Sequence, residues 1–176
     1  MNFAMLSRRA LFLGLAVCLV LGALIVLPWL SPERGVERAW SGVLEAIEDN
    51  DSAALGKYLG ADYRDAFGQD RAGALELAAN LRRHFVTCSL RRERAELVMD
   101  PSGRSALTRA VIRLGGQGSP VATAAAEASA ASDTATVFRW RRNSSKPWDW
   151  RLVSVENPEA ARALRRFNQE AAKLGF

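Results

Sequence analysis

The chain has 176 residues, of which 24 are Lys or Arg and 19 are Asp or Glu, so its formal net charge is +5. Its two cysteines are Cys18 and Cys88 and its one histidine is His84, which excludes a disulfide framework and a structural zinc site. The basic surplus is small and spread along the chain, so we expect no nucleic-acid partner, no bound metal and no other cofactor.

The stretch from residue 10 to residue 30 holds 21 residues and no charged side chain. As a helix it would span about 31 Å, close to the ~30 Å hydrocarbon core of a bilayer. The run is longer than the apolar part of a cleavable secretory signal, and residues 27–30 are large where cleavage needs small ones. We therefore predict an uncleaved signal anchor at 10–30, a short basic flank at 1–9 and one domain at 31–176.

The charges around this run predict the side of the membrane on which the domain lies. Arg8 and Arg9 precede the run in a short flank without acids, which favours a cytoplasmic amino terminus. Arg34 and Arg38 follow it, so the charge count is nearly balanced. Ser7-Arg8-Arg9 also resembles a twin-arginine export motif, although the run is more hydrophobic than such signals usually are. We expect a single-pass protein of a bacterial-type inner or plasma membrane, with an extracytoplasmic domain.

Three helices are predicted after the apolar run, each from a capping residue followed by apolar residues at helical spacing. They extend from Ser31 to Asp49, from Asp51 to Gly60 and from Asp70 to about Phe85. The segment 61–68, between the second and third helices, is predicted to be extended.

The hydrophobic period then changes from helical spacing to two, which indicates strands. The strands are predicted over 89–99, 105–114, 135–142 and 148–155, with turns or loops at 100–103, 115–118 and 143–147. Residues 120–135 are rich in Ala, Ser and Thr, and a strand, a short helix and a loop all remain open for them. In the final hairpin, a pairing of Arg142 with Trp148 would place Trp140 opposite Trp150.

A last helix is predicted from about Asn157, with its apolar residues facing the domain. Those residues are Leu164, Phe167, Ala171 and Leu174. Helices followed by a run of antiparallel strands indicate an α+β fold in which the helices pack on one face of the sheet.

This order of elements resembles the nuclear transport factor 2-like superfamily, whose cone-shaped fold is shared with ketosteroid isomerase and polyketide cyclase-like proteins. The resemblance covers about residues 33–157, and the features that carry it are Trp40, the segment 63–71 and the hairpin 138–153. It implies a cone of about three helices packed on a curved, mostly antiparallel sheet. The transmembrane helix and the helix from about 157 are additions to that pattern.

Catalysis of the ketosteroid isomerase type needs a carboxylate base aimed into the cone and an oxyanion donor opposite it. The candidates are Tyr63 and Asp65, which could reach the mouth of a cone, and His84 at the end of the third helix. Asp65 could instead be a turn acid that pairs with Arg64 or Arg71, and His84 a helix-end residue. The sequence has no phosphate-binding glycine loop, nucleophile elbow or metal-ligand spacing.

Aromatic side chains suggest a pocket for a flat apolar ligand. Trp40, Tyr63, Trp140 and Trp150 are the candidate ligand-binding residues, and packing of the three tryptophans in the core is the alternative. We predict a membrane-anchored, non-catalytic domain that binds a protein or a small hydrophobic ligand, and a homodimer through the sheet face is one form of partner. The alternative function is a membrane-anchored isomerase or cyclase acting on a hydrophobic small molecule.

Overall fold

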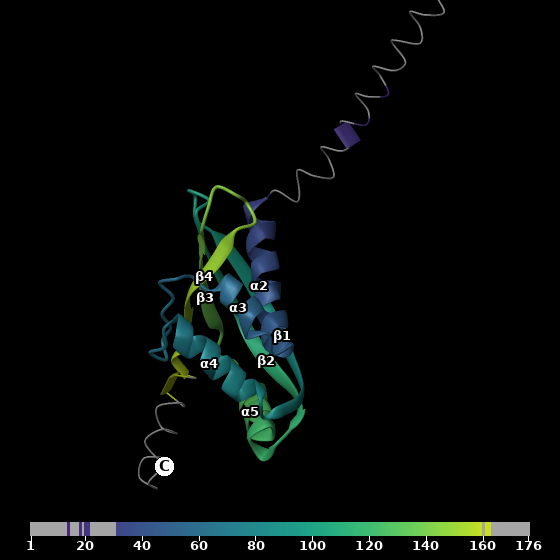
Figure 1. Ribbon diagram of the computed structural model, residues 1–176, viewed down its shortest axis with the longest axis vertical. Coiled ribbons are helices and arrows are strands. Elements are labelled where there is room, and N and C mark those ends of the chain that lie inside the picture. The colour runs from purple at the N-terminus through teal and green to yellow at the C-terminus, as the bar shows by residue number, and fades with distance from the viewer. Residues whose placement is uncertain (1–13, 15–17, 19, 22–30, 160, 163–176) are drawn as a thin grey trace, which may run out of the picture.

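A computed structural model describes residues 14, 18, 20, 21, 31–159, 161 and 162 (Figure 1). Its helices are α2 (Pro32–Glu48), α3 (Ser52–Tyr58), α4 (Arg71–Arg82) and α5 (Pro120–Ala131), and its strands are β1 (Phe85–Met99), β2 (Ser105–Gly118), β3 (Thr136–Arg142) and β4 (Trp150–Glu156). The strands form one antiparallel sheet in the order β1-β2-β3-β4. Helices α2, α3 and α4 lie over one face of it (Figure 1). The predicted α+β class is thereby confirmed.

The three predicted helix caps are confirmed. The side chains of Ser31, Asp51 and Asp70 accept hydrogen bonds from the backbone N–H groups of Arg34, Ala54 and Gly73, at 3.2, 2.8 and 2.9 Å. The third helix ends at Arg82 instead of reaching Phe85. Phe85 instead begins β1, because it pairs with Gly118 across the sheet.

The stretch 115–118 was predicted as a loop, but it continues β2 and pairs with the first residues of β1. The strands approach so closely that a Cβ on Gly116 would lie 1.9 Å from the carbonyl oxygen of Thr87. Gly116 also has a backbone φ of +138°, which residues with a Cβ atom rarely adopt. Glycine at these positions therefore allows β1 and β2 to pair closely. The same glycines, taken as composition alone, had indicated a loop.

The register of the last hairpin differs from the prediction. Arg142 pairs with Trp150 instead of Trp148, and Trp140 lies opposite Leu152. The connection is longer than expected because the N–H of Asn143 donates to the carbonyl of Asp149 at 2.8 Å, which places residues 143–149 in the turn. The shift is two residues at 140–142, which keeps Trp140 and Trp150 on the inner face, and an irregularity between Arg139 and Trp140 makes it three at 137–139, where Phe138 pairs with Val155.

The segment 120–135, left open between strand, helix and loop, contains α5, which packs against the far end of β2. Strand β3 pairs with β2 only over residues 105–110, so the edge of β2 beyond that point needs other partners. The Ser129 hydroxyl supplies them by donating to the carbonyl of Ile112 and accepting from the N–H of Leu114, at 3.0 and 2.8 Å. Helix α5 therefore covers this stretch of sheet edge.

The described terminal residues cover little of the predicted terminal helices. In the predicted membrane segment 10–30, four residues (Gly14, Cys18, Val20 and Leu21) are described, and all are helical and exposed. No helix within the described residues is long and apolar enough to cross a bilayer. Asn157 begins a helical turn by accepting from the N–H of Ala161 at 2.9 Å, while the predicted apolar face from 164 to 174 lies outside the described residues.

Candidate functional site

A cavity of about 410 Å³ lies between α4 and the sheet and reaches the inner faces of α2 and α3. Its polar lining residues are Tyr63, Asp65, Arg82, Cys88, Thr136 and Asn157. Its apolar lining consists of Val43, Leu44, Ile47, Leu55, Leu59, Phe67, Ala74, Leu77, Ala78, Leu81, Phe85, Leu90, Ile112, Leu114, Phe138, Leu152 and Val155. A largely apolar hollow of this volume with a few polar groups has the character of a small-molecule site.

Helix α4 leaves this space unfilled. No residue of α4 is buried, and the side chains of Leu77 and Leu81 stay 39% and 38% exposed although they line the cavity. Ala74 and Ala78 of the same helix also line the cavity, and their small side chains cannot reach across to the sheet. Alanine at two of the five lining positions of α4 therefore leaves room for the cavity.

Tyr63 and Asp65 form the polar group at the end of the cavity near the start of α4. The Tyr63 hydroxyl donates to Asp65 Oδ2 at 3.3 Å, and the tyrosine is only 4% exposed. Burial raises the pKa of the Tyr63 phenol, and the Asp65 carboxylate adds to the rise. The phenol therefore remains protonated at neutral pH and can act only as a hydrogen-bond donor or acceptor.

The other oxygen of Asp65 holds the turn that leads into α4. Asp65 Oδ1 accepts from the backbone N–H groups of Phe67 and Gln69, at 2.9 and 2.8 Å. The alternative that Asp65 is a turn acid is supported in this form, although its partners are backbone groups instead of Arg64 or Arg71. Three hydrogen bonds thus occupy the carboxylate.

Arg82 and Cys88 lie at the opposite end of the cavity, where α4 stops and β1 begins. Arg82 Nε donates to the carbonyl of Glu48 at 2.8 Å, and its Nη1 donates to the carbonyl of Phe85 at 2.5 Å. Burial raises the pKa of the Cys88 thiol, and the positive charge of Arg82 partly opposes the rise. Sequence reasoning assigned neither residue to a site, because the position of Arg82 depends on its hydrogen bond to the carbonyl of Glu48, which is distant in the sequence.

His84 stands apart from the cavity. Its exposed ring lies 3.2 Å, through Nδ1, from the hydroxyl of Ser119, and the residue is absent from the cavity lining. The three predicted catalytic candidates therefore do not converge, because the chain turns away from the cavity between Arg82 and Phe85. Only Tyr63 and Asp65 are brought together.

The tryptophans pack in the core instead of lining the cavity. Trp40, Trp140 and Trp150 are each 1% exposed, and of the predicted ligand-binding residues only Tyr63 lines the cavity beneath α4. Trp140 Nε1 donates to Thr108 Oγ1 and Trp150 Nε1 donates to the carbonyl of Pro147, both at 2.9 Å. Trp140 and Trp150 lie on the inner face of the sheet as predicted, and α2, which carries Trp40, packs so closely on Trp150 that a Cβ on Gly35 would lie 2.7 Å from its Nε1.

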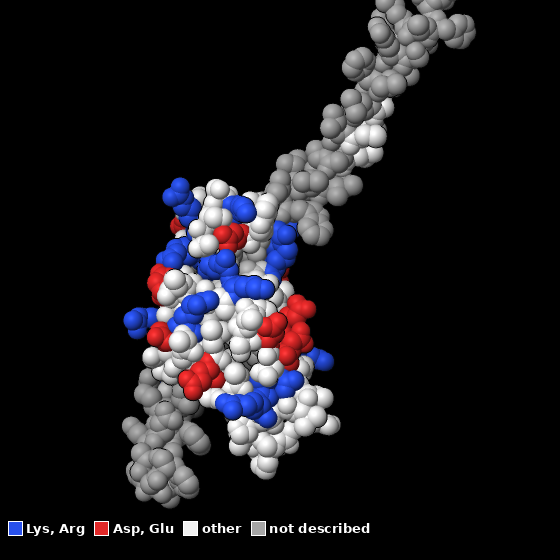
Figure 2. Space-filling view, in the orientation of Figure 1, with Lys and Arg blue, Asp and Glu red and all other residues white. Residues whose placement is uncertain are grey.

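Charge on the surface is mixed in sign. Figure 2 shows basic and acidic side chains interleaved on the face in view, with an uncharged area at the α5 end. On β3, two of the three arginines pair with acids, Arg139 with Glu156 at 2.8 Å and Arg141 with Asp62 at 2.6 Å, while Arg142 donates to the carbonyls of Ser145 and Lys146. Within the described part of the chain, no group of three or more His, Cys, Asp or Glu side chains could hold a metal ion.

No protein-family model matches the chain, and no curated protein matches its sequence. Solved structures do match. Bd1075 of Bdellovibrio bacteriovorus aligns with a TM-score of 0.52 and 9% identity over 70% of this chain, which spans 40% of that protein. An NTF2-like protein of unknown function from Pseudomonas putida gives 0.51 and 11%, with 70% of this chain and 82% of that one covered. Hexachlorocyclohexane dehydrochlorinase LinA-type3 from Novosphingobium barchaimii gives 0.50 and 12%, with 69% and 82% covered.

These likenesses show the fold. The chain has the NTF2-like cone, as the resemblance of the opening helix, the segment 63–71 and the closing hairpin implied. Identities of 9 to 12% carry no information on activity, since this fold hosts many functions.

Proposed function

We propose that this domain binds a hydrophobic small molecule in the cavity between α4 and the sheet. The observation that carries the proposal is a cavity of about 410 Å³ in which 17 of 23 lining residues have apolar side chains. A ligand there would remove its own apolar surface and that of Leu77 and Leu81 from water, which is favourable by roughly 25 cal/mol per Å².

We further infer that residues 10–30 hold the domain at a bacterial-type inner or plasma membrane, on the extracytoplasmic side. The uncharged run of 21 residues supports this, as do Arg8 and Arg9 before it. A hydrophobic ligand that partitions into lipid would then be concentrated near the domain.

We propose that the bound molecule is not chemically changed. Both oxygens of Asp65 accept hydrogen bonds, one from the Tyr63 hydroxyl and the other from two backbone N–H groups. A general base needs a lone pair directed at the substrate, whereas Oδ1 is engaged by the turn before α4 and Oδ2 accepts from the Tyr63 hydroxyl.

The test uses Cys88 as a reporter inside the cavity, since it is a free thiol of the lining. The full chain with Cys18→Ser is placed in nanodiscs, and labelling of Cys88 by N-ethylmaleimide is followed with and without decanol. We expect decanol to slow labelling, and Ala78→Phe, which fills the cavity, to abolish this protection. Labelling that proceeds at the same rate at saturating decanol would contradict the proposal.

The second candidate function is an isomerase of hydrophobic ketones. The observation in its favour is that Tyr63 and Asp65 meet at 3.3 Å on the cavity wall. A β,γ-unsaturated steroid ketone offered to the full chain would then become the conjugated enone, measured by ultraviolet absorbance. Turnover that Tyr63→Phe and Asp65→Asn both remove would favour this function, whereas the binding proposal predicts no turnover above that of the variants.

A further inference from the structure

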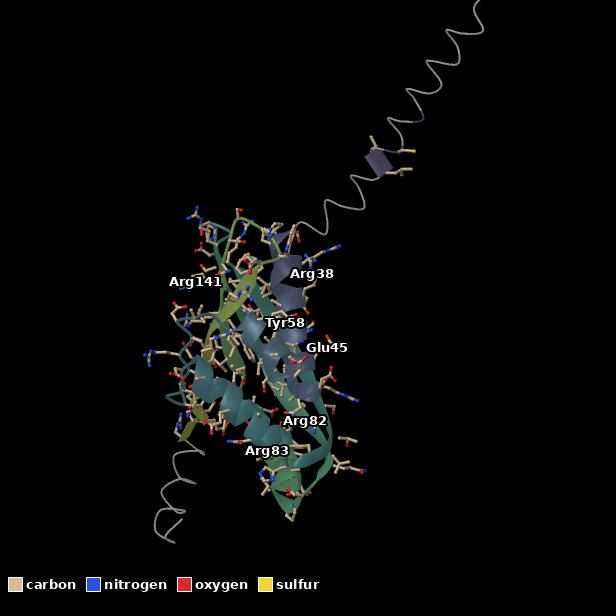
Figure 3. All side chains as sticks on the ribbon, in the orientation of Figure 1. Arg38, Glu45, Tyr58, Arg82, Arg83 and Arg141 are labelled. Carbon is tan, nitrogen blue, oxygen red and sulfur yellow. The ribbon has the colours of Figure 1, made fainter. Side chains whose placement is uncertain are left out.

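We propose that the ligand carries an anionic head, a carboxylate on an apolar chain, which the Arg82 guanidinium holds at the α4–β1 end of the cavity. This inference rests on the proposed binding function and names the class of ligand. Figure 3 labels Arg82 at the C-terminal end of α4, beside Arg83. Arg82 lines the cavity, whereas Arg83 is exposed and does not.

The backbone fixes the Arg82 side chain while leaving donors for a ligand. Nε and one N–H of Nη1 are bound to the carbonyls of Glu48 and Phe85. Among the described residues, Nη2 has no acceptor, so its two hydrogens and the second hydrogen of Nη1 remain available. Two neighbouring N–H groups of a guanidinium match the two oxygens of a carboxylate.

The charge of Arg82 is also not neutralised by a neighbouring acid. Of the carboxylates in the described residues, none lies within 4.0 Å of its guanidinium. The carboxylate of Glu48 is bonded to the N–H of Leu90 instead. A partly buried cation next to an apolar cavity is stabilised by an anion that the chain itself does not supply.

The other end of the cavity fixes the orientation of such a ligand. Asp65 lies just before α4 and Arg82 at its last turn, and a helix of 12 residues is about 18 Å long. The Asp65 carboxylate repels an anion, so the head lies at Arg82 and the apolar chain extends along α4 between the leucines and the sheet.

The test compares decanoate with decanol, which share a chain and differ in the head group. Protection of Cys88 from N-ethylmaleimide is measured at about pH 8, where the carboxylate is ionised, on the full chain with Cys18→Ser in nanodiscs. Protection is the ratio of the labelling rates with and without ligand for the same variant. If a substitution alters the intrinsic reactivity of Cys88, both rates change equally and the ratio is unaffected. Decanol and decanoate partition differently into the nanodisc lipid. This difference does not affect the result, because the variants are compared with one another for the same ligand.

We expect Arg82→Gln to raise the decanoate concentration for half-protection at least about tenfold and to leave that for decanol unchanged. Arg83→Gln, the matched control, should behave as the parent chain with both ligands. Raising the salt from about 0.05 M to about 0.5 M should weaken protection by decanoate alone, a readout that needs no variant at Arg82.

The outcomes separate the two proposals. Protection by decanol and decanoate that is insensitive to both Arg82→Gln and salt would overturn the anionic head and leave the binding function standing. If neither ligand protects Cys88, the binding function itself fails.

Discussion

At the residue scale, the buried indole N–H groups of the three tryptophans are accommodated in different ways. Trp140 donates to Thr108, which is 0% exposed, so the hydroxyl oxygen supplies the acceptor that the buried indole needs. Trp40 makes no such bond, because its Nε1 has no acceptor in the described residues. The Arg92 guanidinium carbon lies 4.5 Å from the centroid of the Trp40 ring, so the aromatic face carries the polar contact.

Replacing Thr108 by Val should lower the free energy of unfolding by about 1–3 kcal/mol, because the buried Trp140 N–H then loses its acceptor at constant side-chain volume. Urea unfolding followed by tryptophan fluorescence measures the change. The control is Thr123→Val on the exposed side of α5, expected within about 0.5 kcal/mol of the parent chain. Equal effects of the two substitutions would remove any structural role for the Thr108 hydroxyl.

The Cys88 thiol should titrate at a higher pH in the folded protein than in the unfolded chain, because burial raises its pKa. The reactive thiolate fraction is then smaller at any pH below that pKa, and labelling by N-ethylmaleimide should keep rising beyond pH 9. The measurement is the pH profile of the labelling rate with Cys18→Ser, in the absence and presence of urea. Coincident profiles would show that the cavity wall leaves Cys88 as hydrated as an unfolded thiol.

At the element scale, the long antiparallel pair of β1 and β2 is the frame on which the cavity is built. The pair begins where α4 ends, and it brings Cys88 and Leu90 of β1 beside Ile112 and Leu114 of β2. Its first residues can pair only because Gly116 allows the strands to approach closely.

Gly116→Ala should therefore destabilise the protein by about 2 kcal/mol or more, since the added Cβ meets the Thr87 backbone at a positive φ. Gly115→Ala is the matched control, because its Cβ meets only the rotatable Ser89 hydroxyl, at 2.9 Å. Thermal unfolding of both variants checks the prediction. A midpoint for Gly116→Ala at or above that of Gly115→Ala would contradict it.

Helix α5 is attached to β2 by Arg113 as well as by the Ser129 hydroxyl. Arg113 Nη1 donates to the carbonyls of Ser129, Ala130 and Ser132, at 2.8, 3.0 and 2.7 Å, and thereby satisfies the end of the helix. Arg113→Gln should speed amide hydrogen exchange over residues 120–131, whereas Arg109→Gln on the same strand should not. Unchanged exchange in α5 would mean that Ser129 alone holds the helix to the sheet.

At the scale of the whole molecule, α2 follows the predicted membrane segment directly, whereas the C-terminal end of α4 lies near α5, toward the other end of the domain (Figure 1). Arg82 in the last turn of α4 lines the cavity. The outer side of β3 carries the Arg139–Glu156 and Arg141–Asp62 pairs, so this part of the sheet face is charged. A homodimer through the sheet face stays a prediction, and it would have to accommodate these pairs.

The full chain should remain in the membrane pellet after extraction at alkaline pH, because a helix of 21 uncharged residues is stable in lipid. Deletion of residues 1–30 should release it. In spheroplasts, added protease should digest the domain if it lies outside the cytoplasm, with a cytoplasmic protein as the protected control. Digestion only after lysis would contradict the predicted orientation and indicate a cytoplasmic domain.

The sequence by itself determined α2, α3 and α4 with their caps, and the inward faces of the last two strands, because these depend on neighbours within a few residues. Ser31, Asp51 and Asp70 capped their helices as predicted, and Trp140 and Trp150 turned inward. Only the tertiary structure decided the hairpin register, the strand at 115–118 and the site. The strand depends on the close approach of Gly116 to Thr87, and the site on the hydrogen bond from Arg82 to the carbonyl of Glu48, and both are contacts between segments distant in the sequence.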